Sequence, residues 1–379
     1  MAAFANRRLP ASAVCWCLVA FGVYVWMGSL LRAKEPDETT ADQQQVYLFT
    51  SFEEPATAGL RFLWSGDGLQ WKRVPGVFMK PAAGKGHLMR DPSLVQGPDG
   101  TYHLVWTTNW RGDLGFGYAS SSDLVHWSPQ RFIPVMEHEP STVNVWAPEL
   151  FYDSKSQDFI IAWASTIPGR YPIREEREDN NHRMYYTRTK DFKQFSPAQL
   201  FCEPGFSVID AVIVPWGRDE GPAYKLVLKD NTRPVLALRV AEGDSPTGPW
   251  RNVTKPITAF KTEGPSVAKV GDRWLIYFDQ YGDHQYRAVS TTDFESFEDL
   301  EDEVQFPQGH KHGTVLKVER RVLDGLQKAG SEQEEHADSS ALNEEAQSCH
   351  EPVRSSMCPG GGDIGMRWIH SLSGVQHHG

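Results

Sequence analysis

Short runs of alternating apolar and polar residues fill the middle of the chain, and turns rich in Gly, Pro and Asp separate them. One run covers residues 101–106 (TYHLVW) and follows a Gly-Pro-Asp-Gly turn at residues 97–100. A period of two predicts half-buried β-strands, because successive side chains of a strand point to opposite faces. The pattern therefore predicts an all-β body built from strand meanders.

Four stretches of this kind begin alike. Their opening signatures are Arg90-Asp91-Pro92-Ser93, Trp146-Ala147-Pro148-Glu149, Val208-Ile209-Asp210-Ala211 and Thr262-Glu263-Gly264-Pro265-Ser266. Each signature leads into an apolar strand, a turn and a second strand. The unit recurs at roughly 40 to 60 residues, which is the spacing of four-stranded β-propeller blades. Four blades are expected within residues 86–300.

The two ends of the body complete the ring. Residues 312–318 (HGTVLKV) resemble a first blade strand, and residues 46–50, 60–65 and 68–71 resemble the outer strands of the same blade. Closing the ring with both chain ends removes the exposed edges that an open sheet would leave. The sequence thus predicts a five-bladed β-propeller over residues 46–320, closed by N- and C-terminal strands.

The segments outside the body differ in character. Residues 12–31 are apolar and uncharged, and about 20 such residues can span a bilayer as a helix. We expect residues 1–34 to be an uncleaved signal anchor, with a cleaved signal peptide as the alternative, and residues 35–45 to be a polar stalk. The body would then lie in the secretory lumen or outside the cell, held at the membrane, or secreted if the segment is cleaved.

Two polar segments lack strand periodicity. Residues 321–379 are rich in Glu, Gln, Ser, Gly and His and are expected to form a disordered tail. Residues 166–182 interrupt the second blade and read as a surface loop. That loop either covers the mouth of the ring or is a solvated charged insertion.

Composition narrows the choice of partner. The formal net charge of −11 disfavours a nucleic-acid partner, which needs clustered Lys and Arg. The chain holds 13 Trp, 12 Tyr and 19 Phe, a supply that suits strand packing and also the stacking of sugar rings. The five cysteines form neither a disulfide framework nor a zinc spacing within the body.

Three of the four signatures open on a carboxylate, namely Asp91, Asp210 and Glu263. If the units are repeats, these acids occupy matching positions and a closed ring aims them at one axis. Inverting hydrolysis of a glycosidic bond uses one protonated acid and one carboxylate that activates water, roughly 6.5–9.5 Å apart. A third carboxylate can hold the acid's pKa high. Each acid also has a plain alternative, as a turn residue, a structural partner of an Arg or a loop charge.

The Arg-Asp-Pro-Ser, Trp-Ala-Pro-Glu, Val-Ile-Asp, Glu-Gly-Pro-Ser and His-Gly-Thr-Val signatures, in this order, resemble glycoside hydrolase family 43 over about residues 46–318. The resemblance implies a five-bladed propeller that inverts anomeric configuration without a required cofactor. It implies Asp91 as general base, Glu263 as general acid and Asp210 as the residue that tunes the acid's pKa. Members act largely on α-L-arabinofuranosides and β-D-xylosides of oligo- and polysaccharides, and some act on galactose-containing chains.

Other residues are candidates for contact with the sugar. Trp110, Trp146, Phe206 and Tyr281 could form a sugar platform, and Arg90 and Arg287 could bond sugar hydroxyls or the acids; core packing is the alternative for each. His312 lies at the matching position of the fifth blade. In related enzymes such a His can associate with Ca²⁺, but the sequence shows no carboxylate-rich loop for this ion, so a channel-lining, hydrogen-bonded His is the other interpretation.

Two further functions stay open. Retaining five-bladed enzymes that hydrolyse fructosides use an Asn-Asp-Pro-Asn context and a Glu-Cys pair, and this chain has Arg-Asp-Pro-Ser and Glu-Gly-Pro instead. A non-catalytic propeller that binds glycans or protein is the second, because a fold alone does not establish activity.

Overall fold

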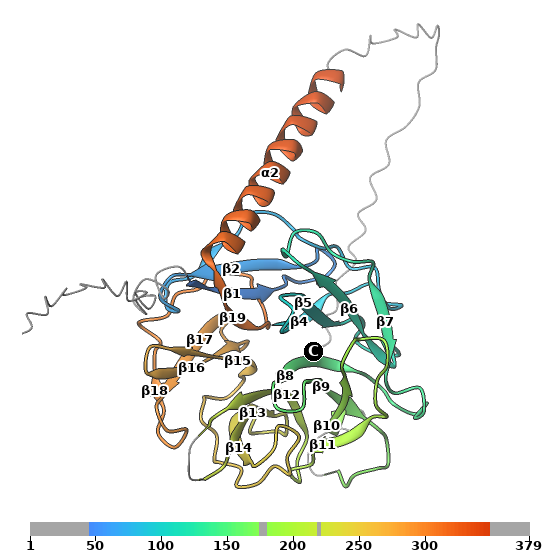
Figure 1. The fold of residues 1–379 in the computed structure, drawn as a ribbon, viewed down its shortest axis with the longest axis vertical. Coiled ribbons are helices and arrows are strands. Elements are labelled where there is room, and N and C mark those ends of the chain that lie inside the picture. Colours follow the sequence, from blue (N-terminus) through green and yellow to red (C-terminus); the bar gives the residue numbers. More distant parts are fainter. Residues whose placement is uncertain (1–44, 174–179, 218–220, 349–379) are drawn as a thin grey trace, which may run out of the picture. The chain divides into compact units, whose positions relative to one another are not determined.

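Five β-sheets surround one axis in the computed structural model, which describes residues 45–173, 180–217 and 221–348 (Figure 1). Among these residues four sheets have four strands and one has three. Within each sheet, strands that follow one another in the sequence pair as antiparallel neighbours. The prediction of an all-β, five-bladed propeller is confirmed.

The first two blades follow one another along the chain. The first blade consists of β4 (Arg90–Gln96), β5 (Tyr102–Thr107), β6 (Gly115–Ser121) and β7 (Arg131–Pro134). The second consists of β8 (Trp146–Asp153), β9 (Asp158–Thr166), β10 (His182–Thr189) and β11 (Gln199–Cys202).

The third and fourth blades complete the continuous part of the ring. The third blade has β12 (Val208–Pro215), β13 (Tyr224–Asp230) and β14 (Ala237–Gly243). The fourth has β15 (Glu263–Val270), β16 (Arg273–Gln280), β17 (Gln285–Thr291) and β18 (Glu298–Asp299).

The third blade lacks the fourth strand that the repeat predicts. Beyond β14 the sheet continues as an isolated bridge between Glu242 and Arg251 and as single backbone hydrogen bonds from the Thr254 and Ile257 N–H groups to β14. The segment that follows contains Pro246, Pro249 and Pro256. A proline has no N–H to donate to a strand ladder, so the run cannot pair regularly.

The closing blade joins the two ends of the body, as predicted. It contains β19 (Val315–Glu319), β1 (Gln45–Ser51), β2 (Arg61–Ser65) and β3 (Lys72–Arg73). The strand β19 pairs antiparallel with β1, with Val318 opposite Val46 and Leu316 opposite Leu48. The first strand of this blade therefore comes from one end of the body and the others come from the opposite end.

A helix follows the propeller where a disordered tail was expected. The helix α2 (Arg320–Ser348) begins directly after β19. Leu323 and Leu326 are fully buried against the closing and first blades, and Val322 and Ala329 pack beside them. Four apolar residues at helical spacing are enough to seat one face of a helix. That stripe is short, so the polar composition of the whole tail concealed it.

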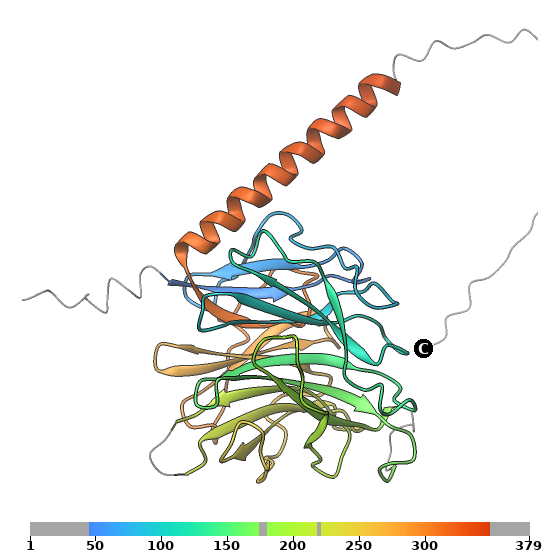
Figure 2. The same cartoon turned by 45° about the vertical axis from the view of Figure 1, so that its right-hand side comes forward.

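Beyond this seat the helix leaves the body, as Figures 1 and 2 show. Residues 1–44, which hold the predicted anchor and stalk, and residues 349–379 lie outside the described part of the chain. So do residues 174–179, the charged centre of the predicted surface loop. In the described ranges, no helix combines the length and the apolarity that a bilayer crossing needs. The anchor stays a prediction.

We predict that Leu323→Ala lowers the free energy of unfolding by about 2–5 kcal/mol, because the substitution leaves a cavity under the helix. Chemical denaturation of the full chain, followed by tryptophan fluorescence, measures the change. The matched control is Lys328→Ala, an exposed position of the same helix, which should change stability by less than about 0.5 kcal/mol. Equal stabilities of the two variants would contradict a packed helix.

Candidate active site

A β-bulge near the axis shapes the first strand of four blades. The register shifts by one residue between Arg90 and Ser93 in β4, and the same shift recurs in β8, β12 and β15. In each of these four blades the first residue of the bulge has a positive φ: Asp91 (50°), Ala147 (44°), Asp210 (50°) and Gly264 (59°). A bulge re-aims a side chain, and this conformation is unfavourable for residues other than glycine. The fold therefore keeps two aspartates in a strained position at the axis.

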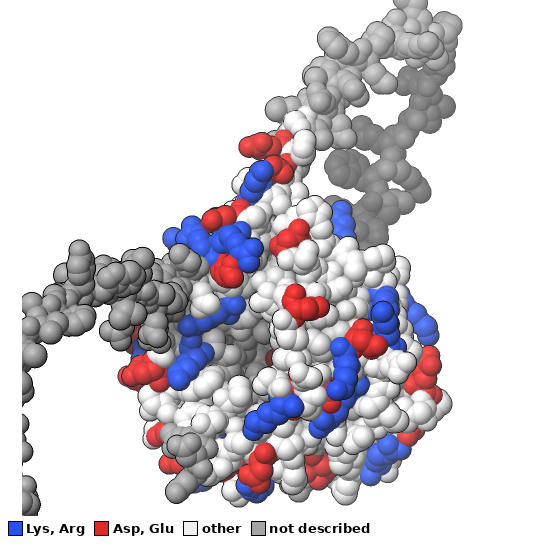
Figure 3. Space-filling view, in the orientation of Figure 1, with Lys and Arg blue, Asp and Glu red and all other residues white. Residues whose placement is uncertain are grey.

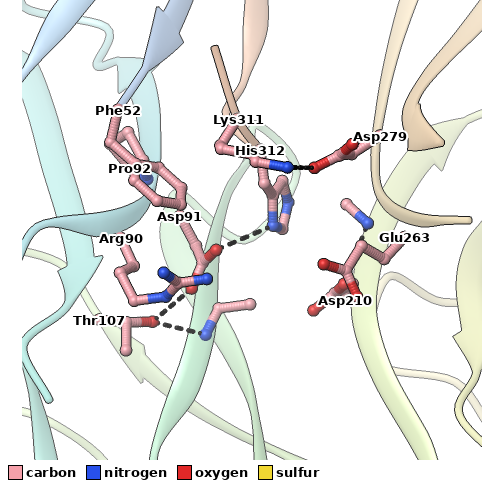
Figure 4. Close-up of polar contacts among 12 residues, drawn as sticks. Phe52, Arg90, Asp91, Pro92, Thr107, Asp210, Glu263, Asp279, Lys311 and His312 are labelled. Atoms are coloured by element: carbon pink, nitrogen blue, oxygen red, sulfur yellow. Dashed lines mark hydrogen bonds and ion pairs between the residues drawn. The ribbon is translucent and has the colours of Figure 1, made fainter. Parts of the chain in front are cut away.

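The bulges correct one expectation about the three acids. Asp91 and Asp210 do occupy matching positions, but Glu263 stands one residue earlier, because Gly264 is the bulge residue of β15. Glu263 matches Arg90 of the first blade instead. Its longer side chain nevertheless reaches the same pit, and Figure 4 shows Asp210 and Glu263 together, facing Asp91 across it.

Two hydrogen bonds hold the Asp91 carboxylate. The Thr107 hydroxyl donates to Oδ2 over 2.8 Å, and the His312 Nδ1 lies 3.2 Å from Oδ1 (Figure 4). Burial alone would raise the pKa of Asp91, but the hydrogen bond and charge of His312, with Arg90 and Thr107, hold it below its usual range. Asp91 is therefore an ionised carboxylate.

His312 is the cationic partner of Asp91. Burial would lower its pKa, but the bond to Asp91 and the negative charges of Asp210 and Asp91 raise it to about 9. Ca²⁺ prefers oxygen ligands, which an imidazole does not offer. The described residues also contain no group of three or more His, Cys, Asp and Glu side chains arranged to hold an ion. The residues around His312 do not fit Ca²⁺ as a direct ligand set.

The facing pair, Asp210 and Glu263, has a different electrostatic balance. Asp210 Oδ2 accepts a 3.0 Å bond from the Gly264 N–H, and burial, reinforced by the charge of Glu263, raises its pKa to about 6. Burial also acts on Glu263, but Lys229 donates to its Oε2 over 2.7 Å and brings its pKa below the usual range. Of this pair the carboxyl with the raised pKa is Asp210, whereas the predicted acid was Glu263.

Accessibility separates the two members of this pair. The Glu263 side chain is 34% exposed, whereas Asp210 is 7% exposed. Across the pit the Asp91 side chain is 14% exposed. Glu263 and Asp91 can therefore touch a bound molecule from opposite sides, and Asp210 lies behind them. Figure 3 shows that this face is hollowed where the first strands converge in Figure 1, with charged side chains of both signs around it.

Glu149 is an axial residue to which the sequence analysis assigned no role. It lines a small pocket on the axis with Ser93 and Thr314, next to Asp91, Asp210 and His312. Burial raises its pKa to about 7, against the opposing effects of Ser93, His312 and Thr314. The Trp-Ala-Pro-Glu signature had a carboxylate at its end, and counting from the bulge would have placed it on the axis.

Three charged residues at the pit were also missed. Lys229 and Asp279 are the next-to-last residues of β13 and β16, opposite Ile209 and Glu263 respectively. Lys311, beside His312, donates to Asp279 over 2.8 Å (Figure 4). For Lys229 and Asp279 the available signal was a charged residue near the end of a largely apolar strand.

Two predicted sugar-binding residues form one aromatic wall next to Asp91. Trp110 is 50% exposed, and its ring meets Trp146 edge-on at 5.8 Å. The Arg90 guanidinium lies 3.8 Å from the centre of the Trp110 ring and is ion-paired with Glu54. The Trp146 indole N–H donates to the Trp110 carbonyl oxygen over 2.8 Å. The wall is thus held rigidly although one face of it is open.

The remaining candidates lie in different surroundings. The Tyr281 ring lies beneath Lys229 at 5.0 Å, beside the Glu263 pair, and Phe206 packs under Arg239 at 5.3 Å. Arg287 belongs to β17, the third strand of its blade, and its ion pairs go to Asp283 and Glu301 rather than to the three acids. The structure does not bring Arg287 to the acids.

The fold and the facing carboxylates define a propeller of the glycosyl hydrolase class, and the family comparison agrees. Residues 42–324 match the family model Glyco_hydro_43_rel, described as "Probable glycosyl hydrolase domain". The match covers most of the 379 residues, and the chain belongs to this family.

Individual relatives are distant. An alpha-L-arabinofuranosidase of Bifidobacterium longum subsp. longum is 20% identical over an alignment of 252 residues that covers 54% of this chain and 23% of that protein. The chain thus spans about a quarter of the length of this curated relative.

Solved structures show a similar distance. A family 117 glycoside hydrolase of Zobellia galactanivorans has a TM-score of 0.48 at 15% identity, covering 64% of this chain and 77% of its own. An alpha-L-arabinofuranosidase of Lactobacillus brevis has a TM-score of 0.41 at 17% identity, covering 56% and 72%. The assignment of a five-bladed propeller therefore rests on the five sheets of this chain and not on these solved structures.

We predict that the His312 imidazole titrates with a pKa of about 9 and that Asp91→Asn lowers this value. Its folded pKa exceeds the ordinary 6.5, so the His312 charge stabilises the fold fully below pH 6.5, and this contribution is lost as the pH rises to about 9.

Two measurements check this expectation. NMR of the histidine ring protons gives the pKa in each variant, and denaturation curves of wild type and His312→Gln between pH 6 and 10 give the stability difference. A stability difference that stays constant across this range would contradict the Asp91–His312 ion pair.

Proposed function

We propose that the chain is an inverting glycoside hydrolase that cleaves arabinofuranosyl or xylosyl linkages, with galactosyl linkages as a third class, in plant-type polysaccharides or glycans. The observation that carries this proposal is the arrangement across the pit: Asp91, kept ionised by His312, faces the accessible carboxyl of Glu263. A water-activating base and a proton donor on opposite sides of one bond are what single displacement needs.

The proposed reaction proceeds in one step. Asp91 accepts a proton from water as the water oxygen attacks the anomeric carbon. Protonated Glu263 gives its proton to the glycosidic oxygen as the bond from that oxygen to the anomeric carbon breaks. Asp91 ends protonated and Glu263 ionised, and exchange with solvent restores both.

Asp210 provides a negative charge beside the proposed proton donor, Glu263. Asp210 and Glu263 are close enough to titrate as a pair, so the first proton belongs to the pair rather than to one carboxyl. The greater exposure of Glu263 makes it the member that reaches the leaving oxygen. Asp210 then carries the negative charge that keeps a proton on Glu263.

The aromatic wall and the Bifidobacterium relative indicate which substrates to test first. Trp110 offers an open ring face on which the apolar face of a sugar can stack. The Bifidobacterium relative is named an alpha-L-arabinofuranosidase, which supports testing arabinofuranosides first.

Glu263→Gln is expected to lower kcat/KM for 4-methylumbelliferyl arabinofuranoside or xyloside by about 10²–10⁴-fold, because the basic leaving group needs a proton. The 2,4-dinitrophenyl substrate should lose less, since its phenolate leaves unprotonated. Asp91→Asn should slow both substrates alike. Glu301→Gln, an exposed partner of Arg287, is the control that keeps wild-type rates. Wild-type activity in Glu263→Gln would exclude Glu263 as the acid.

The stereochemical outcome tests the mechanism separately. Proton NMR during the first minutes of hydrolysis should show the anomer opposite to that of the substrate, before mutarotation mixes the two. A first product of retained configuration would rule out single displacement and favour a double displacement, as in fructoside-hydrolysing propellers.

A further inference from the structure

Lys229 is a buried amine at the edge of the pit. It stands at the end of β13, opposite Ile209, and its side chain is only 3% exposed. Lysines are rarely buried without a partner, because desolvating an ammonium costs much free energy. Here burial lowers the pKa of Lys229, but the charges of Glu263 and Asp210 outweigh burial and raise it above its usual range. The side chain therefore stays cationic.

The ammonium of Lys229 points at the accessible acid. Its Nζ lies 2.7 Å from Glu263 Oε2 and 5.0 Å from the centre of the Tyr281 ring. A short, buried, charge-assisted bond fixes both the position and the charge of its acceptor. The exposed part of Glu263 is thus oriented from behind by β13 of the neighbouring blade.

The same strand position links the next pair of blades. Asp279, at the end of the second strand of the fourth blade, accepts a bond from Lys311 of the closing blade over 2.8 Å. Lys229 and Glu263 repeat this contact between the third and fourth blades with the signs reversed. The Lys229 contact is therefore a built element of the interface between blades.

We infer that Lys229 is a positioning residue, which fixes the Glu263 carboxylate on the wall of the pit and keeps it negatively charged until it takes up a proton beside bound substrate. The inference rests on the proposed function, in which Glu263 is the proton donor. It adds that a cation from the neighbouring blade sets the protonation of that donor.

Several other groups face Glu263 and contribute to its charge state. They come from every element packed around it and include Asp91 (β4), Asp210 (β12), Asp279 (β16), Tyr281, Tyr286 (β17) and His312. Asp91, Asp210 and Asp279 oppose ionisation of Glu263, whereas His312 and Lys229 favour it. Lys229 alone of these donates a hydrogen bond to the carboxylate in the described residues. Its removal should have the largest effect on Glu263.

The test compares the pH profiles of kcat/KM for wild type, Lys229→Met, Lys229→Gln and Lys229→Arg with 4-methylumbelliferyl glycosides. The basic limb reports the proton donor in the free enzyme. Loss of the Lys229 cation should shift the basic limb to higher pH by about one to three units in the Met and Gln variants. The Arg variant should keep the wild-type limb. An unchanged limb in Met and Gln, or a shift of the acidic limb alone, would overturn the inference.

A second readout does not need turnover. The ¹³C resonance of the Glu263 carboxyl, assigned by its loss in Glu263→Gln, should titrate at higher pH in Lys229→Met than in wild type. An unchanged midpoint refutes the role of Lys229 even if every glycoside fails as a substrate. A shifted midpoint in a protein that cleaves none of the glycosides supports the control of the Glu263 charge by Lys229 and rejects the proposed function.

The matched control is Lys225→Met on the same strand. Lys225 is also buried, with 8% of its side chain exposed, and lies 3.9 Å from Glu242 away from the pit. It should leave both the basic limb and the Glu263 midpoint unchanged. An equal shift in Lys225→Met would assign the effect to loss of a buried charge in β13 and overturn the inference.

Discussion

The pairing of β19 with β1 is the constraint on which the site depends. It joins the ends of the body and places His312, just before β19, against Asp91 in β4, more than 200 positions away in the sequence. The seam is tied at the same level by Thr50, whose hydroxyl donates to the Pro92 carbonyl oxygen over 2.5 Å and accepts from the Thr314 N–H over 2.8 Å. Without this closure Asp91 would lose the hydrogen bond and charge of His312, the largest of the effects that hold its pKa down against burial.

A second constraint acts around the ring. Residues at or near the end of three second strands contact the start of the next blade: Thr107 accepts from the Ala147 N–H, Lys229 donates to Glu263, and Asp279 accepts from Lys311. Phe52 does the same in the closing blade, where its ring lies 4.8 Å from the Arg90 guanidinium. Chemically different contacts at one position thus hold neighbouring blades together and shape the pit.

The sequence predicted what is local and missed what is shared between blades. Period-two alternation and turn residues identified the strands, and the recurrence of similar signatures identified five blades and the split closing blade. The offset of Glu263 was readable, because aligning Pro92-Ser93 with Pro265-Ser266 places Gly264 rather than Glu263 at the position of Asp91. The roles of Lys229 and Glu149 were missed because they depend on neighbours in other blades. The seated turns of α2 were missed because Leu323 and Leu326 stand out only against the surface they cover.

The packing of α2 connects the C-terminal end of the body with the candidate active site. Its buried leucines rest on residues of both the closing and the first blade, the two sheets that meet at the Asp91–His312 seam. Proteolytic trimming back to Glu319 would therefore uncover part of the junction between the two blades that hold Asp91 and His312. The helix therefore stabilises a junction that, in the described residues, noncovalent contacts hold together. Hydrolytic activity should decrease when the helix detaches, before the whole fold melts.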